Sequence, residues 1–151
     1  EPFLMTFRIK GKLVTICTFH AITRSKDPET EVKYFKYFPE QYQNLNLVFC
    51  GDSNLPESHT VFNPLKRMGF ESALQDQKTS LRQACIEDDC LASEFDNVFF
   101  RQGDIHELEA GVNHFYRRFD SIGEALKISD HIPVVFRFEI LRAPSTVVNT
   151  N

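Results

Sequence analysis

The chain has 151 residues, of which 42% are hydrophobic, so it can bury a core and is not compositionally disordered. Its 21 acidic and 17 basic residues give a formal net charge of −4, without the basic excess typical of proteins that bind nucleic acid by neutralising phosphates. No apolar run reaches the roughly 18 residues of a membrane span, and the first residues lack a signal-peptide pattern. We therefore expect one soluble globular unit, whose compartment (cytoplasm, periplasm or outside the cell) stays open.

Two strands joined by a tight turn are expected at the start of the chain. Residues 4–10 and 12–19 are rich in apolar and β-branched side chains, and Gly11 separates them. That pattern predicts a β-hairpin whose second strand runs into His20. Residues 45–51 form a continuous apolar run of the kind found in strands buried on both faces, so a third strand is expected there.

Two helices are expected around this third strand. Pro28 suits the first position of a helix over residues 29–37, and Pro39 is expected to end or kink that helix. A second, shorter helix is predicted over residues 58–68, with Gly69 after its last turn.

The second half of the chain is predicted to consist of strands, one long loop and one short helix. Strands are expected at residues 70–74, 95–101, 105–116 and 132–140. Residues 75–92 are polar, acidic and weakly patterned, which predicts a surface loop. Asp120 is expected to cap a helix over residues 121–127.

The four cysteines fall into two groups. Cys17 and Cys50 lie in apolar strands and are expected to be small buried side chains. Cys85 and Cys90 flank an acidic segment, and they either close a local disulfide or stay reduced; a zinc site there lacks the second ligand pair that such sites usually have. We interpret the acidic residues 87–89 as a solvated charged loop, with a structural Ca²⁺ site as the alternative.

Polar clusters stand at the ends of several predicted strands. The sequence Ser-Asp-His-Ile-Pro at residues 129–133 precedes the last strand, and Gly-Asp-Ser-Asn at residues 51–54 ends the third. His20 ends the second strand, and Asp96 stands near the start of another. Gly-Asp-Ser-Asn alone is equally typical of a turn. Four strand ends that carry acids, an amide and imidazoles together indicate a catalytic site.

In this order and chemistry, the chain resembles the C-terminal half of the endonuclease/exonuclease/phosphatase superfamily, and within it the deoxyribonuclease I branch most closely. The likeness covers roughly residues 3–138. His20 and Ala21 are similar to the His-Ala pair of that branch, and residues 119–128 resemble its final loop and short helix. Ser53 departs from the family pattern, which usually has an aromatic residue or Met there, and is expected to alter the packing beneath the motif.

The resemblance implies an α+β fold: an α/β sandwich that is the C-terminal half of the four-layer αββα deoxyribonuclease I-like fold, with mostly antiparallel strands and flanking helices. Such domains can run to roughly 250 residues, and residues 3–7 already resemble the strand that crosses the middle of the fold. We therefore expect residues 1–141 to be the C-terminal part of one domain without its N-terminal half, and residues 142–151 to be a flexible tail. The absent half would carry the family's early Asn, its metal-binding Glu and the acid that pairs with the first catalytic His.

The resemblance also assigns roles at the phosphate. Asp52 would orient or deprotonate the attacking water, and Asn54 would hold the phosphate oxygens or a metal-bound water. We expect these two side chains on the same side of an extended strand end, because strand side chains alternate between faces. His20 would be a second imidazole on the phosphate.

The last motif would supply an acid and a metal ligand. His131 would donate a proton or hydrogen bond to the phosphate in the transition state, while Asp96 holds its other ring nitrogen. Asp130 would bind a hard divalent cation, Mg²⁺ or Mn²⁺. The predicted metal ligands are Asp130, Asp52 and Asn54.

Three functions are compatible with these residues. The leading hypothesis is a metal-dependent endonuclease of the deoxyribonuclease I type that hydrolyses DNA, with this chain inactive alone. The alternatives are another phosphoesterase of the superfamily, acting on a phosphoinositide, sphingomyelin or a nucleotide, or an inactive remnant that serves as a binding module. Apolar faces of residues 13–19 and 45–49 would be left uncovered, so the expected partners are the missing half or a second copy of the chain.

Overall fold

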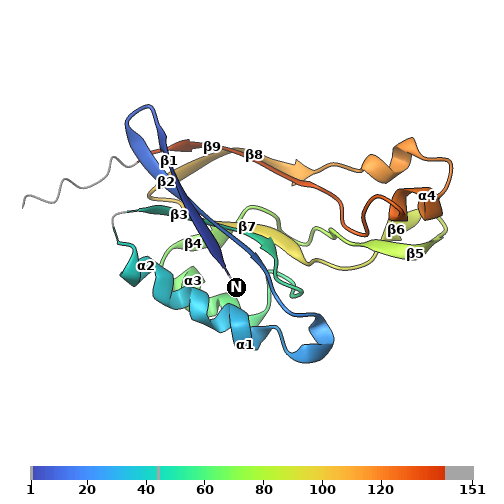
Figure 1. The fold of residues 1–151 in the computed structure, drawn as a ribbon, viewed down its shortest axis with the longest axis horizontal. Helices are drawn as coiled ribbons and strands as arrows, with labels where there is room; N and C mark the ends of the chain where they lie inside the picture. The colour runs from blue at the N-terminus through green and yellow to red at the C-terminus, as the bar shows by residue number, and fades with distance from the viewer. Residues whose placement is uncertain (1, 44, 142–151) are drawn as a thin grey trace, which may run out of the picture.

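The computed structural model describes residues 2–43 and 45–141 (Figure 1). The strands are β1 (Phe3–Ile9), β2 (Lys12–His20), β3 (Asn46–Asp52), β4 (Phe70–Ser72), β5 (Leu81–Ile86), β6 (Asp89–Leu91), β7 (Asp96–Arg101), β8 (Ile105–Val112) and β9 (Val134–Ile140). The helices are α1 (Glu29–Val32), α2 (Phe38–Gln41), α3 (Asn63–Arg67) and α4 (Ile122–Leu126), with 3₁₀ turns at Arg24–Lys26, Lys33–Tyr37, Thr60–Phe62 and Phe115–Arg118. None of these described helices has the length and apolar character needed to cross a membrane. The predicted tail, residues 142–151, lies outside the described residues.

The main sheet brings three predicted site residues side by side. Within the described residues it has the strand order β1-β2-β3-β7-β4, with β2 and β3 parallel and the other neighbours antiparallel. The pairing register aligns His20 with Asp52 and Asp52 with Asp96. The α+β class with mostly antiparallel strands is confirmed.

The β1–β2 hairpin was predicted correctly and has a local cause. Its two turn residues, Lys10 and Gly11, have φ angles of 50° and 81°. Positive φ at both turn positions matches the right-handed twist of the flanking strands, and glycine adopts it without steric cost.

One face of the main sheet is covered by the helical segments that follow β2 and β3 (Figure 1). Phe35 packs against Phe19 and Phe49, with ring centroids 4.6 and 5.3 Å away. Pro39 was expected to end or kink the first helix; it does not end the helical segment, which continues as α2 to Gln41. Pro39 stands in the first turn of α2, where its missing N–H would have no acceptor within the helix.

The two-stranded β8–β9 sheet covers part of the other face. Its side chains Ile105, Phe136 and Ile140 pack with Val48 and Phe100 of the main sheet. The result is three layers in Figure 1: helices, the main sheet, and the two-stranded β8–β9 sheet. The predicted strand 105–116 is shorter than expected, because β8 ends at Val112 and a 3₁₀ turn follows.

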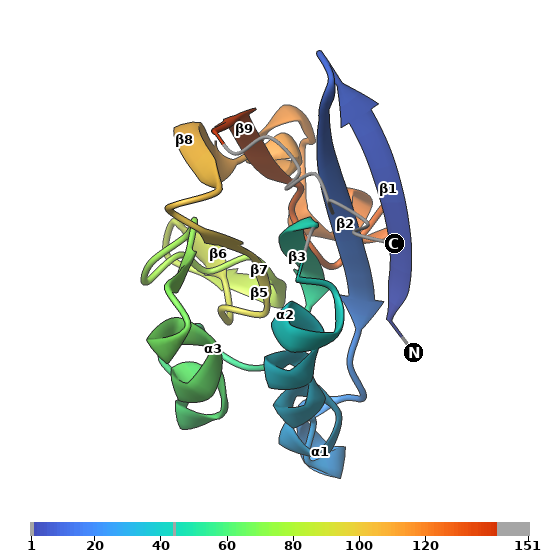
Figure 2. The same cartoon turned by 90° about the vertical axis from the view of Figure 1, so that its left-hand side faces the viewer.

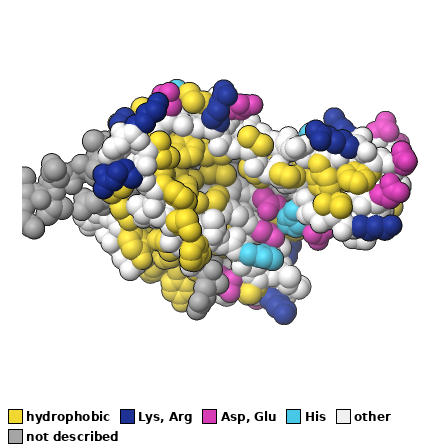
Figure 3. Space-filling model, turned by 45° about the horizontal axis from the view of Figure 1, so that its top comes forward, with side chains coloured by type: hydrophobic (Ala, Val, Ile, Leu, Met, Phe, Trp, Pro, Cys, Tyr) yellow, Lys and Arg dark blue, Asp and Glu magenta, His cyan; other side chains and the backbone are white. Residues whose placement is uncertain are grey.

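The expectation that residues 13–19 and 45–49 leave apolar faces uncovered is wrong, because β2 and β3 are interior strands with mostly buried side chains. The apolar stripe that the second sheet leaves uncovered lies on β1. Phe3, Met5, Phe7 and Ile9 alternate along β1 and are 60%, 46%, 43% and 46% exposed. They share a face with Val14, which is buried under β8–β9. Figure 2 shows β1 at the edge of the sheet, with β8–β9 on the other side of β2, and Figure 3 shows hydrophobic side chains gathered on this part of the molecule.

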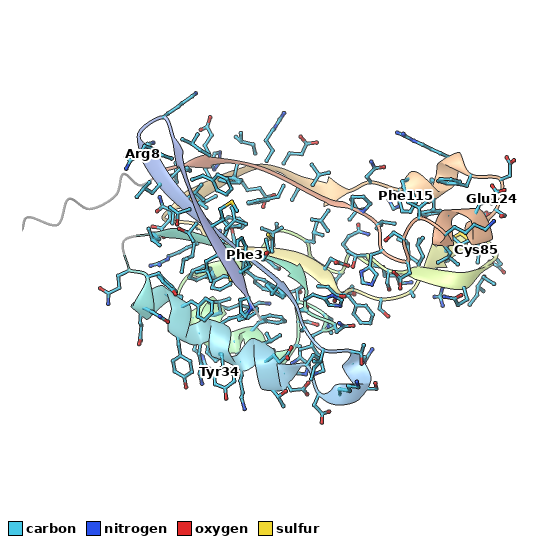
Figure 4. The ribbon with its side chains drawn as sticks, in the orientation of Figure 1. Phe3, Arg8, Tyr34, Cys85, Phe115 and Glu124 are labelled. Atoms are coloured by element: carbon cyan, nitrogen blue, oxygen red, sulfur yellow. A yellow bond between two sulfur atoms is a disulfide. The ribbon has the colours of Figure 1, made fainter. Side chains whose placement is uncertain are left out.

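The surface loop that was predicted for residues 75–92 is wrong from residue 81 onwards, where the chain forms a hairpin that projects with α4 as an arm (Figure 1). Strands β5 and β6 form a hairpin there, and a disulfide joins Cys85 to Cys90 across it. The hairpin packs with α4 around Leu81, Ala125 and Ile132. Cys85 and the α4 residue Glu124 lie in the arm, far from Phe3 of β1 (Figure 4).

The start of α4 differs by one residue from the prediction. Ser121, not Asp120, is the N-cap, because the Ser121 hydroxyl accepts a hydrogen bond from the N–H of Glu124 at 3.3 Å.

Candidate active site

The junction between the arm and the main body carries the predicted site. Figure 3 shows histidine and acidic side chains gathered at this junction. His20, Asp52 and Asp96 reach it from the ends of β2, β3 and β7. His131 reaches it from the segment before β9, where the N–H of Ile132 donates to the carbonyl of Thr79 at 2.7 Å.

His131 and Asp96 form a close pair. The Nδ1 atom of His131 lies 2.6 Å from Oδ2 of Asp96, so the predicted contact is confirmed, while the catalytic roles of both residues stay predictions. The hydrogen bond to Asp96 raises the pKa of His131 above its ordinary value of 6.5, and the charges of Asp52 and Asp130 add to this effect against the opposing effect of burial.

Asp52 lies between the two imidazoles. Its Oδ2 atom is 3.5 Å from Nε2 of His20 and 3.8 Å from Nε2 of His131. Burial raises the pKa of Asp52 above its ordinary value of 3.8 and the charge of Asp96 adds to this, while the N–H of Asn54 and the two histidines act in the opposite direction. A carboxylate with a raised pKa is a stronger base towards a nearby water.

Asn54 is placed differently from the sequence prediction. Strand β3 ends at Asp52, and Asn54 has a φ angle of 53°, so Asn54 does not continue the extended strand that was expected to place both side chains on one side. The N–H of Asn54 donates to Oδ1 of Asp52 at 2.7 Å, and its side-chain Nδ2 donates to the carbonyl of Ala21 at 3.0 Å. Asn54 is buried and ties the end of β3 to the segment after β2.

Gly51 and Ser53 explain why this local sequence can form the turn. A Cβ atom on Gly51 would lie 1.9 Å from the carbonyl oxygen of Phe19, so only glycine allows this close approach of β2 and β3. The Ser53 hydroxyl contacts the carbonyl oxygens of Leu55 and Phe95 at 2.8 and 2.9 Å. Ser53 thus has a hydrogen-bonding role between β3 and the segment before β7, while its expected effect on packing stays a prediction.

Thr79 is a site residue that the sequence did not reveal. It is fully buried, and its hydroxyl lies 2.7 Å from Oδ2 of Asp96. No motif marks it, because it belongs to a polar stretch and meets Asp96 only in the folded chain.

Among the described residues, one group of three potential ligands lies close enough for a single metal ion: Asp52, Asp96 and His131. The Oδ2 atom of Asp96 already contacts the Thr79 hydroxyl and His131, so this oxygen is engaged in hydrogen bonds. Asp52 and the exposed Asp130 offer hard carboxylate oxygens, and one or two carboxylates with water molecules suffice for Mg²⁺. These oxygens are of the kind that a hard divalent cation prefers, but Asp130 does not belong to the close group, and the predicted ligand set Asp130, Asp52 and Asn54 stays a prediction.

A cavity of about 420 Å³ adjoins this site. Asp96 and His131 line it together with the apolar side chains of Phe115, Ile128 and Pro133. The site is therefore open on one side to a space large enough for part of a substrate or of another polypeptide segment.

Comparisons with known proteins identify the fold. No family model matches the chain, and no curated protein gives a significant match. D. rerio TDP2 complexed with single-strand DNA product matches at a TM-score of 0.64 and 12% identity, over 90% of this chain and 60% of that one. The human Nocturnin catalytic domain with bound sulfate matches at 0.60 and 15% identity, over 91% and 52%. Mannosyl-6-phosphatase Bt3783 from Bacteroides thetaiotaomicron matches at 0.57 and 16% identity, over 88% and 53%.

Other matched structures are described as endonuclease/exonuclease/phosphatase family proteins, from Bacteroides thetaiotaomicron and Leptotrichia buccalis. The chain spans about half the length of most of these solved structures. The resemblance inferred from the sequence motifs is thus confirmed at the level of fold: the chain has the fold of about half of an endonuclease/exonuclease/phosphatase family protein.

Proposed function

We propose that this chain carries the catalytic His–Asp pair and the base of a metal-dependent phosphodiesterase, and that the complete enzyme is an endonuclease of the deoxyribonuclease I type. The observation that carries the proposal is the convergence of His20, Asp52, Asp96 and His131 at one junction, from four separate segments. Residues 1–141 are then the C-terminal part of one catalytic domain.

His131 acts on the phosphate through Nε2, the ring nitrogen that does not face Asp96. With Nδ1 directed at Asp96, Nε2 is left to donate to a phosphoryl oxygen. The raised pKa of His131 favours the protonated imidazole, which stabilises negative charge as it develops in the transition state.

Asp52 acts on the water. Its Oδ1 atom is held by the N–H of Asn54, which leaves Oδ2 to accept a proton from a water beside the phosphate. His20, whose side chain is 75% exposed, lies 3.5 Å from Asp52 and is placed to contact the phosphate from the other side.

Asp52 and Asp130 would hold a divalent cation, Mg²⁺ or Mn²⁺. When bound, such an ion polarises the phosphoryl oxygens and offsets their negative charge. The ion would also compensate for the net charge of −4, which by itself disfavours a nucleic-acid substrate.

DNA is the proposed substrate, and one matched structure, D. rerio TDP2, is described with a single-strand DNA product. A second candidate has support of its own. Another matched structure is described as a mannosyl-6-phosphatase, and a fold shared at 16% identity does not determine the substrate. A phosphoesterase that acts on phosphoinositides, sphingomyelin or nucleotides is therefore the alternative.

The exposed stripe on β1 needs a partner in this proposal. Large apolar side chains at the edge of a sheet favour association. We propose that the remainder of a longer domain covers them, and that a second copy of the chain does so when that remainder is absent.

The test is a plasmid-nicking assay on the product of the longest open reading frame that contains this sequence. We expect nicking with Mg²⁺ or Mn²⁺ and none in excess chelator. Undiminished nicking in chelator would contradict the metal dependence. Turnover of a phosphoinositide, sphingomyelin or a nucleotide without action on DNA would favour the alternative. If the protein hydrolyses none of these phosphoesters, the remaining hypothesis is an inactive remnant that serves as a binding module.

A further inference from the structure

The Thr79 hydroxyl is the centre of a buried hydrogen-bond network. Its Oγ1 atom lies 3.1 Å from the backbone nitrogen of Phe95, 2.9 Å from that of Asp96 and 2.7 Å from Oδ2 of Asp96. The two N–H groups can only donate, so Oγ1 accepts from both. The single hydroxyl proton is then directed at Oδ2 of Asp96.

The same carboxylate oxygen receives a second donor. Oδ2 of Asp96 also lies 2.6 Å from Nδ1 of His131. Two donors on one oxygen define how the carboxylate is rotated, and a carboxylate facing Nδ1 favours the imidazole tautomer with its proton on that nitrogen. Nε2 of His131 is thereby the nitrogen that takes up the second proton, and it can then donate that proton to the phosphate.

The backbone around Thr79 holds the other member of the pair. The Thr79 carbonyl accepts from the N–H of Ile132 at 2.7 Å, and the N–H of Leu81 donates to the carbonyl of Asp130 at 2.7 Å. These two bonds flank His131 in the chain. Thr79 thus joins the start of β7, which carries Asp96, to the segment that carries His131.

We propose that Thr79 is a positioning residue of the active site, whose hydroxyl orients Asp96 so that Asp96 in turn orients His131. This inference rests on the proposed function of the site. Thr79 contacts no reacting atom; it acts through Asp96, and its methyl group has no part in this role.

Ser80 provides a matched control on the same segment. Its hydroxyl is also buried, and it contacts the backbone nitrogen and oxygen of Ser93 at 3.0 and 3.3 Å. A buried hydroxyl is lost in both Thr79→Val and Ser80→Ala, but only Thr79 contacts Asp96. A general loss of stability would affect both variants, whereas loss of positioning would affect only the first.

The experiment compares Thr79→Val, Thr79→Ser and Ser80→Ala in the full-length protein. Side-chain ¹⁵N chemical shifts of His131, measured in metal-free buffer at one pH at which the imidazole is neutral, report its tautomer, and phosphodiester hydrolysis reports kcat and KM. We expect Thr79→Val to lose the preference for a proton on Nδ1 and to lower kcat about 10- to 100-fold with little change in KM. Thr79→Ser should restore both, and Ser80→Ala should leave both unchanged.

Wild-type tautomer and kcat in Thr79→Val would overturn the proposal, as would equal changes in Thr79→Val and Ser80→Ala. If Thr79→Val does not fold, a crystal structure of the unsubstituted protein decides: a Thr79 hydroxyl within hydrogen-bond distance of Asp96 supports the proposal, and one beyond it refutes it. If the unsubstituted protein hydrolyses no phosphoester, the proposed function fails, while the tautomer comparison still decides whether Thr79 positions His131.

Discussion

The Nδ1 atom of His131 and the Oδ2 atom of Asp96 lie 2.6 Å apart, although the two residues are 35 positions apart in the sequence. This contact joins the end of the main sheet to the segment before β9. This contact determines which nitrogen of His131 faces the open side of the site.

Asp96→Asn is expected to lower the pKa of His131. The hydrogen bond to Asp96 is the largest cause that raises this pKa above 6.5, and burial, which lowers it, would remain. A group with a raised pKa in the folded state contributes its full stabilisation below the unfolded pKa of about 6.5 and loses it as the pH rises through the folded value. The stability of the unsubstituted protein should therefore fall as the pH rises above about 6.5, and Asp96→Asn should abolish this fall. NMR titration of His131 measures the shift, and an unchanged pKa would contradict the pairing.

Reduction of the Cys85–Cys90 disulfide is expected to weaken the arm without disturbing the site. The bridge joins residues five apart, and a loop of that size corresponds to about 2 kcal/mol of unfolding free energy. Urea denaturation of the Cys85→Ser, Cys90→Ser double variant measures this loss. A changed ¹⁵N spectrum of His131 in the folded variant would show that the arm and the site are coupled more closely than expected.

The exposed stripe on β1 is expected to drive self-association of this chain when it is produced alone. Met5→Lys and Phe7→Lys together place charges in the stripe and should shift the chain towards monomer, because charged residues on an edge strand oppose pairing. Light scattering after size-exclusion chromatography measures the mass. Ile86→Lys changes a single exposed apolar residue in the arm and should have no effect. A monomer before substitution would contradict the prediction.

Gly51→Ala is expected to destabilise the fold by at least about 1–3 kcal/mol, since backbone strain of this kind costs that much at one residue. The added Cβ would lie 1.9 Å from the carbonyl oxygen of Phe19, and the φ angle of Gly51 is 150°. Gly103→Ala is the control, because a Cβ there meets nothing within 4 Å. Chemical denaturation compares the two, and equal stabilities would show that β2 and β3 can separate at little cost.

The sequence predicted the elements whose signals are local. Gly11 separates two apolar strands, and its positive φ produces the predicted turn. The strand ends at His20, Asp52 and Asp96 could also be predicted, because apolar runs stop at these polar residues. Their alignment in one register followed from the family resemblance rather than from the individual segments.

The features that were missed depend on contacts between distant segments. The β5–β6 hairpin has a polar sequence, and its order comes with a disulfide and with packing on α4. The inward bond of Asn54 requires a left-handed backbone that residue spacing does not reveal. Thr79 meets Asp96 across 17 residues, and no local pattern distinguishes it from its neighbours.

The most direct test of the proposed phosphodiesterase is the effect of His131→Gln on hydrolysis by the full-length protein with Mg²⁺. His106, an exposed histidine on β8, provides the matched control His106→Gln. We predict that His131→Gln lowers kcat by about 10² or more, the scale for losing a general acid, while His106→Gln retains wild-type kcat. Equal hydrolysis rates in the two variants would contradict the account, because the convergence of Asp52, Asp96 and His131 would then serve some purpose other than catalysis.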